Sequence, residues 1–253
     1  MQQITDVSTA IFSVVQLHAC LGSALVAMGP ETFLSLIPLN FEAEDLSVSN
    51  KWLFPILKQY IVGVRLKYFT EEILPMIESA RENAQKVFDI FFFEMQCYFS
   101  SWYSFPTLYI LQLEKQELMK ADTLVYSLWS LLPSFCNYPS DTAKSFKDLE
   151  KHLRSKLKEE PNIRGIICTS LQLLIRQNKN IKDSNDKDDS KQDMAKEQVL
   201  YNYSQQVATE NLRALEISAN NLLKDLSDVF LKSTKDDGGC LQVLFLQCSM
   251  HYS

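Results

Sequence analysis

Glycine and histidine are scarce in this chain, and each shortage excludes a class of protein. Six glycines in 253 residues are too few for a fold built on tight turns or on phosphate-binding glycine loops. The three histidines, His18, His152 and His251, lie at no spacing diagnostic of acid–base or nucleophilic catalysis. Because glycine costs a helix about 1 kcal/mol relative to alanine, its scarcity favours a helical protein that is not an enzyme.

Motifs for cofactors and metals are missing from the sequence as well. It contains no G-x-G-x-x-G, P-loop, H-E-x-x-H or G-x-S-x-G run. The six cysteines form no C-x-x-C pair, and none lies at zinc-ligand spacing from a histidine. We therefore expect no cofactor, no metal and no small-molecule substrate. We interpret the cysteines as reduced thiols of an intracellular protein, with Cys136 and Cys168 buried as small hydrophobic residues.

Positive charge is in short supply too. The chain has 25 Lys and Arg against 31 Asp and Glu, a formal net charge of −6. A protein that binds nucleic acid unaided usually carries net positive charge, because phosphate neutralisation dominates its affinity. Any contact with RNA must therefore come from a local basic patch or from partner proteins.

Long apolar runs are punctuated by proline. Pro38, Pro55, Pro75 and Pro133 each lie inside an apolar cluster, and the first three are spaced by roughly half of a two-helix repeat. A proline within a helical pattern kinks the helix or starts it afresh. Short helices of this kind stack as antiparallel pairs that bury their apolar faces against neighbouring pairs. The pattern predicts an all-α fold, a HEAT/armadillo-like α-solenoid of antiparallel helix pairs, although an irregular helical bundle has the same spacing.

Composition divides the chain into four parts. Residues 1–178 are expected to form a helical-repeat block, in which the aromatic-rich stretch 88–112 is an anomalous insertion. A polar, disordered loop is expected over 179–198, since that stretch has almost no apolar residues. A helical segment over 199–235 then continues the solenoid, and 236–253 form an irregular tail.

Individual helices can be placed within this scheme. The apolar run 7–29 ends at Gly29-Pro30, a typical helix stop, and its interrupting polar residues favour a buried solenoid helix over a membrane span. Trp52 and Trp129 lie in apolar helical stripes and are interpreted as core anchors. Ser140 or Asp141 is expected to cap the next helix, which runs over 142–158.

That helix carries the best candidate for a binding surface. At 100° per residue its apolar residues form one stripe and five cations form a second, about a third of a turn away. The cations are Lys144, Lys147, Lys151, Arg154 and Lys158. Aligned over about 20 Å, they can follow a phosphate backbone or an acidic protein surface. An ordinary solvated face with a Glu150–Arg154 pair is the alternative interpretation.

One long stretch resembles a known family. "LWSLLPSFCNYPSDTAKSFKDLEKHLRSKLKEEPNIRGIICTSLQLLI" (128–175), "WLFPILKQYI" (52–61) and "FLKSTKDDGGCLQ" (230–242) are similar to the ribosomal RNA-processing protein 12 family. The resemblance implies a non-enzymatic HEAT/armadillo-type solenoid of the nucleus and nucleolus. Such proteins associate with pre-ribosomal proteins and precursor rRNA and support small-subunit maturation and export.

The resemblance leaves other functions open. A link to a Ran GTPase and the nuclear-transport machinery belongs to the family, so a karyopherin-like adaptor acting through protein–protein contacts is the alternative. A truncated product without function is a third interpretation, because the chain is far shorter than the family's solenoid. The insertion 88–112 and the tail after Gln242 have no counterpart in the family pattern. No membrane association is expected.

Overall fold

The computed structural model describes residues 2–40, 49–99, 119–183 and 203–232. Regular structure within these ranges is entirely helical, which confirms the all-α expectation. The elements are α1 (Gln2–Leu36), α2 (Leu53–Tyr60), α3 (Leu66–Tyr68), the π-helical turn η2 (Phe69–Ile73), α4 (Leu74–Phe99), a helix over 119–129, α6 (Leu132–Phe135), α7 (Thr142–Glu159), the short 3₁₀ turn η3 (Pro161–Ile163), α8 (Arg164–Asp183) and α10 (Gln205–Lys232).

The helices stack as antiparallel pairs, as the solenoid prediction requires. The ring of Tyr60, at the end of α2, lies against Gly22 in α1. The chain after α6 returns to the start of α3, where Ser140 N–H donates to the Val64 carbonyl (3.2 Å). Gln177, late in α8, accepts a hydrogen bond from the Tyr138 N–H just before α7 (3.0 Å). In each pair the chain end of the second helix thus returns to the start or flank of the first. The pairs are α1 with α2, α3–α4 with the helix over 119–129 and α6, and α7 with α8; α10 packs on α7 and α8.

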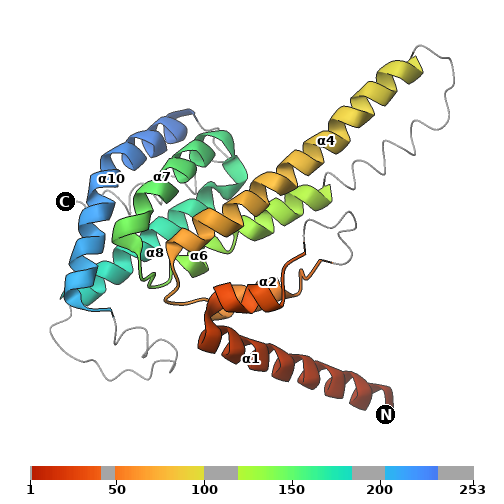
Figure 1. The fold of residues 1–253 in the computed structure, drawn as a ribbon, viewed down its shortest axis with the longest axis horizontal. Coiled ribbons are helices and arrows are strands. Elements are labelled where there is room, and N and C mark those ends of the chain that lie inside the picture. The colour runs from red at the N-terminus through yellow and green to blue at the C-terminus, as the bar shows by residue number, and fades with distance from the viewer. Residues whose placement is uncertain (1, 41–48, 100–118, 184–202, 233–253) are drawn as a thin grey trace.

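The arrangement is elongated. In Figure 1, α7, α8 and α10 lie together at one side, while α4 extends away from them and α1 diverges below. The aromatic-rich insertion predicted at 88–112 is helical as far as residue 99, as the end of α4. The rest of that insertion lies outside the described residues, as does the predicted tail 236–253. The first residues of the loop predicted over 179–198 are instead helical, because α8 continues to Asp183; the rest of that segment lies outside the described residues.

An aromatic cluster forms the centre of the core. The Phe69 ring lies 6.0 Å from the Trp129 ring and 5.4 Å from the Phe135 ring, centroid to centroid. All three side chains are fully buried. They join η2 to the helix over 119–129 and to α6, so the second helix pair is held by large apolar surfaces. Trp129 is therefore a core anchor, as predicted.

Trp52 is a correction to the same prediction. Its side chain is 43% exposed, and its indole Nε1–H donates to the Asn50 side-chain oxygen (3.0 Å). Helix α2 begins only at Leu53, so Trp52 lies before the first turn and does not share the face that buries Leu53, Ile56 and Leu57. The prediction extended the apolar stripe of α2 to Trp52, one residue before the helix begins.

The prolines punctuate the helices in three different ways. Pro30 follows Gly29, whose φ of 78° breaks the helical path inside α1, and this confirms the predicted stop. Pro133 lies in the first turn of α6, where its missing N–H is not needed. Pro75 follows the π-helical turn, in which the Leu74 N–H reaches back five residues to the Phe69 carbonyl. The wider turn accommodates the proline ring, which otherwise crowds the carbonyl four residues earlier.

Helix α1 is less buried than predicted. Leu25, Phe33 and Leu34 are buried, but Val15 is 60% exposed and Leu17 is 54% exposed. The segment Val14–Leu36 has the length and mean hydropathy (1.3) of a membrane-spanning helix. Of its apolar 18-residue stretch, 28% is buried in the structure. The core helix of a soluble protein and a signal sequence share these properties. The expectation of a buried helix is therefore wrong for part of α1. The main neighbour of α1 among the described residues is α2, which covers one side of the helix and leaves residues such as Val15 and Leu17 exposed.

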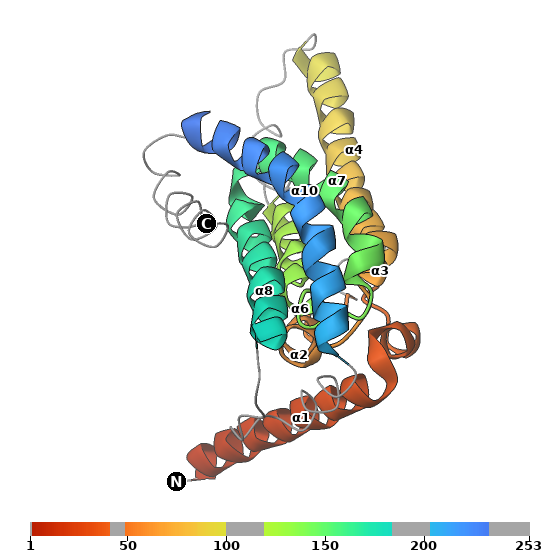
Figure 2. The same cartoon turned by 90° about the vertical axis from the view of Figure 1, so that its left-hand side faces the viewer.

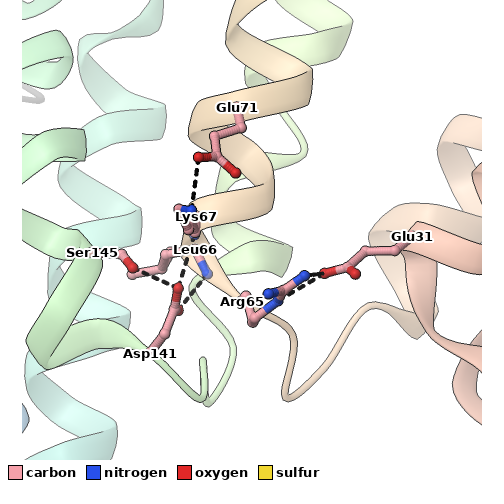
Figure 3. Close-up of polar contacts among 7 residues, drawn as sticks. All are labelled: Glu31, Arg65, Leu66, Lys67, Glu71, Asp141 and Ser145. Atoms are coloured by element: carbon pink, nitrogen blue, oxygen red, sulfur yellow. Dashed lines mark hydrogen bonds and ion pairs between the residues drawn. The ribbon is translucent and has the colours of Figure 1, made fainter.

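Asp141 links two helix starts instead of capping its own helix. It occupies the N-cap position of α7 without a side-chain bond to that helix's first N–H groups. Its carboxylate accepts hydrogen bonds from Leu66 N–H (2.6 Å) and Lys67 N–H (3.1 Å) at the start of α3, and from the Ser145 hydroxyl (2.6 Å) (Figure 3). Asp141, which was predicted to cap its own helix α7, therefore caps the start of α3 instead. Figure 3 also shows Arg65 paired with Glu31 of α1.

Candidate functional site

Helix α7 carries the predicted cation stripe, and its sequence explains its position. Phe146, Leu149, Leu153 and Leu157 recur at helical spacing, and all are buried to 1% exposure or less. This stripe fixes one face of α7 in the core. The helix spans Thr142–Glu159, which confirms the predicted bounds to within a residue. The remaining faces are free to meet α10 or solvent.

The structure divides the five predicted cations into two groups. Lys144, Lys147 and Lys151 are exposed. Lys151 pairs with Asp148 one turn earlier on α7 (3.0 Å), and this pair is about 70% exposed on both sides. Within the described part of the chain, Lys144 and Lys147 take part in no ion pair. These three ammonium groups face outward and are available to an anionic partner.

Arg154 and Lys158 instead bind α10. The Asp225 carboxylate accepts a hydrogen bond from Arg154 Nε (2.5 Å) and lies 2.8 Å from Lys158 Nζ. Arg154 also lies 3.8 Å from Glu150, so the pair predicted from spacing is present. The Asp225 side chain is only 4% exposed. Burial raises the pKa of Asp225, but the hydrogen bonds and charges of Arg154 and Lys158 outweigh burial and hold the pKa below its usual value.

Buried amides fix the other end of α10. The Asn211 side-chain oxygen accepts a hydrogen bond from the Ala143 N–H at the start of α7 (3.0 Å). Its amide nitrogen donates to the Asn178 oxygen of α8 (3.1 Å) and to the Tyr203 hydroxyl (2.6 Å). That hydroxyl donates in turn to Asn178 (3.0 Å). Because each polar atom finds a partner, this buried network orients α10 against α7 and α8 at little desolvation cost.

These contacts define the register of α7 and α10. Ala143 meets Asn211, Glu150 accepts a hydrogen bond from Asn221 (3.4 Å), and Arg154 meets Asp225. Residue numbers increase together, so the two helices run parallel, side by side (Figure 2). The exposed lysines of α7 therefore border a seam whose other wall is α10.

Sequence reasoning missed the role of α10. The apolar residues of α10 recur at helical spacing; Leu215, Ala219, Leu222 and Leu226 are buried, and Leu212 is half-buried. Asp225 lies on the same side, between two buried leucines, where an unpaired carboxylate is costly. That position is the signal that two of the five cations have an internal partner. Asn211 lies on the same stripe and was likewise passed over.

The described residues offer little to catalysis. Among them, no group of three or more His, Cys, Asp or Glu can hold a metal ion. Cys136 and Cys168 are buried, as predicted, and burial raises the pKa of the Cys136 thiol, which makes it a poor nucleophile. The exposed lysines and the α7–α10 seam can bind a partner, and this is the chemistry that the arrangement supports.

Comparison with known proteins finds similarity to one family. A family model described as "Ribosomal RNA-processing protein 12, HEAT repeats" matches residues 3–90 and 108–233. The chain is 31% identical over 163 residues to an RRP12-like protein of Gallus gallus, covering 63% of this chain and 11% of that protein. It is 30% identical over 212 residues to the putative ribosomal RNA-processing protein 12 of Schizosaccharomyces pombe, covering 83% of this chain and 16% of that protein.

A third relative shows the same extent. The ribosomal RNA-processing protein 12 of Saccharomyces cerevisiae is 26% identical over 221 residues, 87% of this chain and 16% of that protein. The chain thus spans between 11% and 16% of the length of these curated relatives. The internal stretch that the family model leaves unmatched, 91–107, lies within the aromatic-rich insertion.

Proposed function

Because the chain belongs to the ribosomal RNA-processing protein 12 family, we propose that it acts in ribosome biogenesis as a helical-repeat scaffold that supports rRNA processing. Relatives over most of the chain carry that process in their names. A scaffold needs no reactive group, and stacked helices offer an extended surface for it. The finer role, in maturation and export of the small subunit, and a location in the nucleus and nucleolus belong to the same proposal.

The observation that carries this proposal is the outward cation group of α7. Lys144 and Lys147 are exposed without an ion pair in the described residues, and Lys151 is held only by an exposed partner. Surface pairs of that kind contribute about 0–1 kcal/mol and are readily exchanged for another anion. In a chain of net charge −6, such a local group is the place where a pre-ribosomal particle meets positive charge.

Affinity purification of the tagged chain from cells, with and without ribonuclease, tests this function. We expect precursor rRNA and small-subunit assembly factors to be recovered. The triple variant Lys144→Glu, Lys147→Glu, Lys151→Glu should lose most of that recovery.

A matched control separates location from net charge. Lys58, Lys86 and Lys182 are also exposed, on α2, α4 and α8, and their change to Glu alters net charge equally. That control should bind like the unchanged chain. Equal loss in both triple variants would contradict a role for α7, and absence of precursor rRNA from every preparation would contradict the function. Recovery of a Ran-type GTPase that survives ribonuclease would instead favour the nuclear-transport adaptor.

A further inference from the structure

An exposed isoleucine lies on α10, off its buried face. Ile217 is 78% exposed, whereas Leu215, Ala219 and Leu222 around it are buried. A single exposed apolar residue needs no explanation by itself. Its position relative to the α7 lysines is what gives it meaning.

The register of the two helices places Ile217 beside those lysines. Ile217 precedes Asn221 by one helical turn, and Asn221 donates its amide hydrogen to Glu150 of α7 (3.4 Å). Lys147 precedes Glu150 by about one turn on α7 and is exposed. Because the helices run parallel, Ile217 and Lys147 lie at the same level of the seam. Lys144 and Lys151 lie one turn to either side along α7.

Exposed charges of both signs lie on roughly the same side of α10 as Ile217. Arg213 lies one turn before Ile217 and Lys224 about two turns after it, while Glu210 and Asp228 lie about two turns before it and three turns after it. Asp148 pairs with Lys151 on the outer side of α7. The apolar centre thus lies among exposed cations of both α7 and α10. A fitting partner carries an apolar side chain flanked by negative charge.

A protein segment fits this description better than RNA does. Single-stranded RNA is usually held by bases stacked on aromatic or guanidinium groups, and an aliphatic Ile217 offers no stacking face. An acidic amphipathic helix presents leucine-type residues and carboxylates one turn apart, as helix-in-groove recognition requires. Apolar burial then supplies affinity, while the lysines supply orientation and rate of association.

We propose that the seam formed by Lys144, Lys147, Lys151 and Ile217 is a docking site for an acidic amphipathic segment of a partner protein. The proposal rests on the proposed scaffold function, which it deepens by naming the kind of partner. Ile217 inserts between apolar side chains of that segment, and its carboxylates pair with the three ammonium groups.

The test measures binding of the full chain to two labelled probes by fluorescence anisotropy. One probe is a short peptide with Leu and Glu at helical spacing, compared with the same peptide carrying Ser for Leu. The other is an oligouridine strand. Ile217→Ser should weaken binding of the Leu/Glu peptide by about fivefold or more. Lys147→Glu should weaken it further, and the Ser peptide should bind at the reduced level throughout.

Leu231→Ser is the matched control. Leu231 is 79% exposed on the same helix, but it lies 14 residues or about 21 Å beyond Ile217, past the Asp225–Lys158 pair at the end of α7. This variant should bind the peptide like the unchanged chain, and circular dichroism should show all three variants folded, because the altered side chains are exposed.

The outcomes separate the docking site from the scaffold function. The proposal is overturned if the unchanged chain does not bind the Leu/Glu peptide, or if Ile217→Ser binds it unchanged. It is also overturned if only oligouridine binds, with dependence on the lysines alone, which identifies a nucleic-acid surface. Precursor rRNA recovered from cells by the Ile217→Ser chain in any of these cases would leave the scaffold function standing.

Discussion

Asp225 decides which α7 cations remain available to a partner. A stripe of five cations looks uniform in the sequence, but Arg154 and Lys158 converge on this one buried carboxylate. A buried carboxylate that loses its cations becomes costly. The α7–α10 contact therefore holds those two side chains, and only the three lysines toward the start of α7 can exchange partners.

The Asp225 pairs predict an acid-sensitive joint between α7 and α10. Because its folded pKa lies below the usual value, the carboxylate contributes stability above its unfolded pKa of about 3.9, and that stability is lost as pH falls through the folded pKa. Asp225→Asn should therefore lower the free energy of unfolding near pH 7. The difference from the unchanged chain should begin to shrink as pH falls below about 3.9 and should vanish once pH lies below the folded pKa.

Urea unfolding followed by circular dichroism at a series of pH values measures this difference. Asp148→Asn is the comparison, since Asp148 is an exposed partner of Lys151 and should matter little at any pH. A pH-independent effect of Asp225→Asn would mean that shape, and not charge, holds the joint.

The burial and hydrogen-bond partners of single residues were the hardest features to predict from sequence. Periodicity identified Trp129 as buried because its neighbours at helical spacing are apolar. The same reasoning failed for Trp52, since a helix start one residue later leaves it outside the first turn. The buried amides Asn178 and Asn211 were not predicted either. Their partners come from different helices, and a hydrogen bond between distant segments leaves no trace in local spacing.

Elements were predicted more accurately than residues. Helix α7 has an uninterrupted apolar stripe and a proline just beyond its end, and its bounds agree with the sequence to within a residue. The helical stretch before Pro75 begins at Leu66 and passes through the π-helical turn Phe69–Ile73. Proline marks a disturbance in the helix, but the sequence does not say whether the chain restarts or widens there.

Gly22 sets the distance between α1 and α2, and its replacement gives a test at this scale. A Cβ atom at position 22 would lie 2.3 Å from Cε2 of Tyr60, so Gly22→Ala forces the ring or the helix to move. Overpacking of this kind costs about 1–3 kcal/mol, against a gain in helix propensity of about 1 kcal/mol. We expect a net loss in the free energy of unfolding, measured from urea unfolding.

Two further variants show whether the clash is the cause. In the Tyr60→Ala background, Gly22→Ala should become neutral or stabilising, because only the gain in helix propensity remains. Gly165→Ala on α8 has no neighbour within 4 Å of the added Cβ and should stabilise the chain by up to about 1 kcal/mol. Loss of stability at both glycines would point to a helix effect unrelated to Tyr60.

At the scale of the whole molecule, the sequence predicts the architecture because stacking repeats impose local rules. Apolar clusters cut by proline indicate short paired helices, and the pairs then have few ways to bury their faces other than against one another. The exposure of α1 was not predictable by the same logic. Periodicity shows that a helix has an apolar face, but it does not show whether a neighbour covers that face.

Stacking also predicts that the chain opens locally. The main contacts of α10 are with α7 and α8, while those of α1 are with α2, so a defect at one end has little direct effect on the other. Leu222→Ala on α10 should cost about 2–4 kcal/mol, and Ile56→Val on α2 about 1 kcal/mol. Both side chains are buried, at 6% and 0% exposure.

Native-state hydrogen exchange with mass spectrometry distinguishes local from global opening. Leu222→Ala should speed amide exchange in α10 and in the facing part of α7, while α2 keeps the protection of the unchanged chain. Ile56→Val should speed exchange in α2 and in the part of α1 near Gly22, and leave α10 unaffected. If either variant speeds exchange in every helix by the same factor, the described helices open as one cooperative unit. Docking at the α7–α10 seam would then stabilise the α1–α2 end as well, which independent opening of the two ends does not allow.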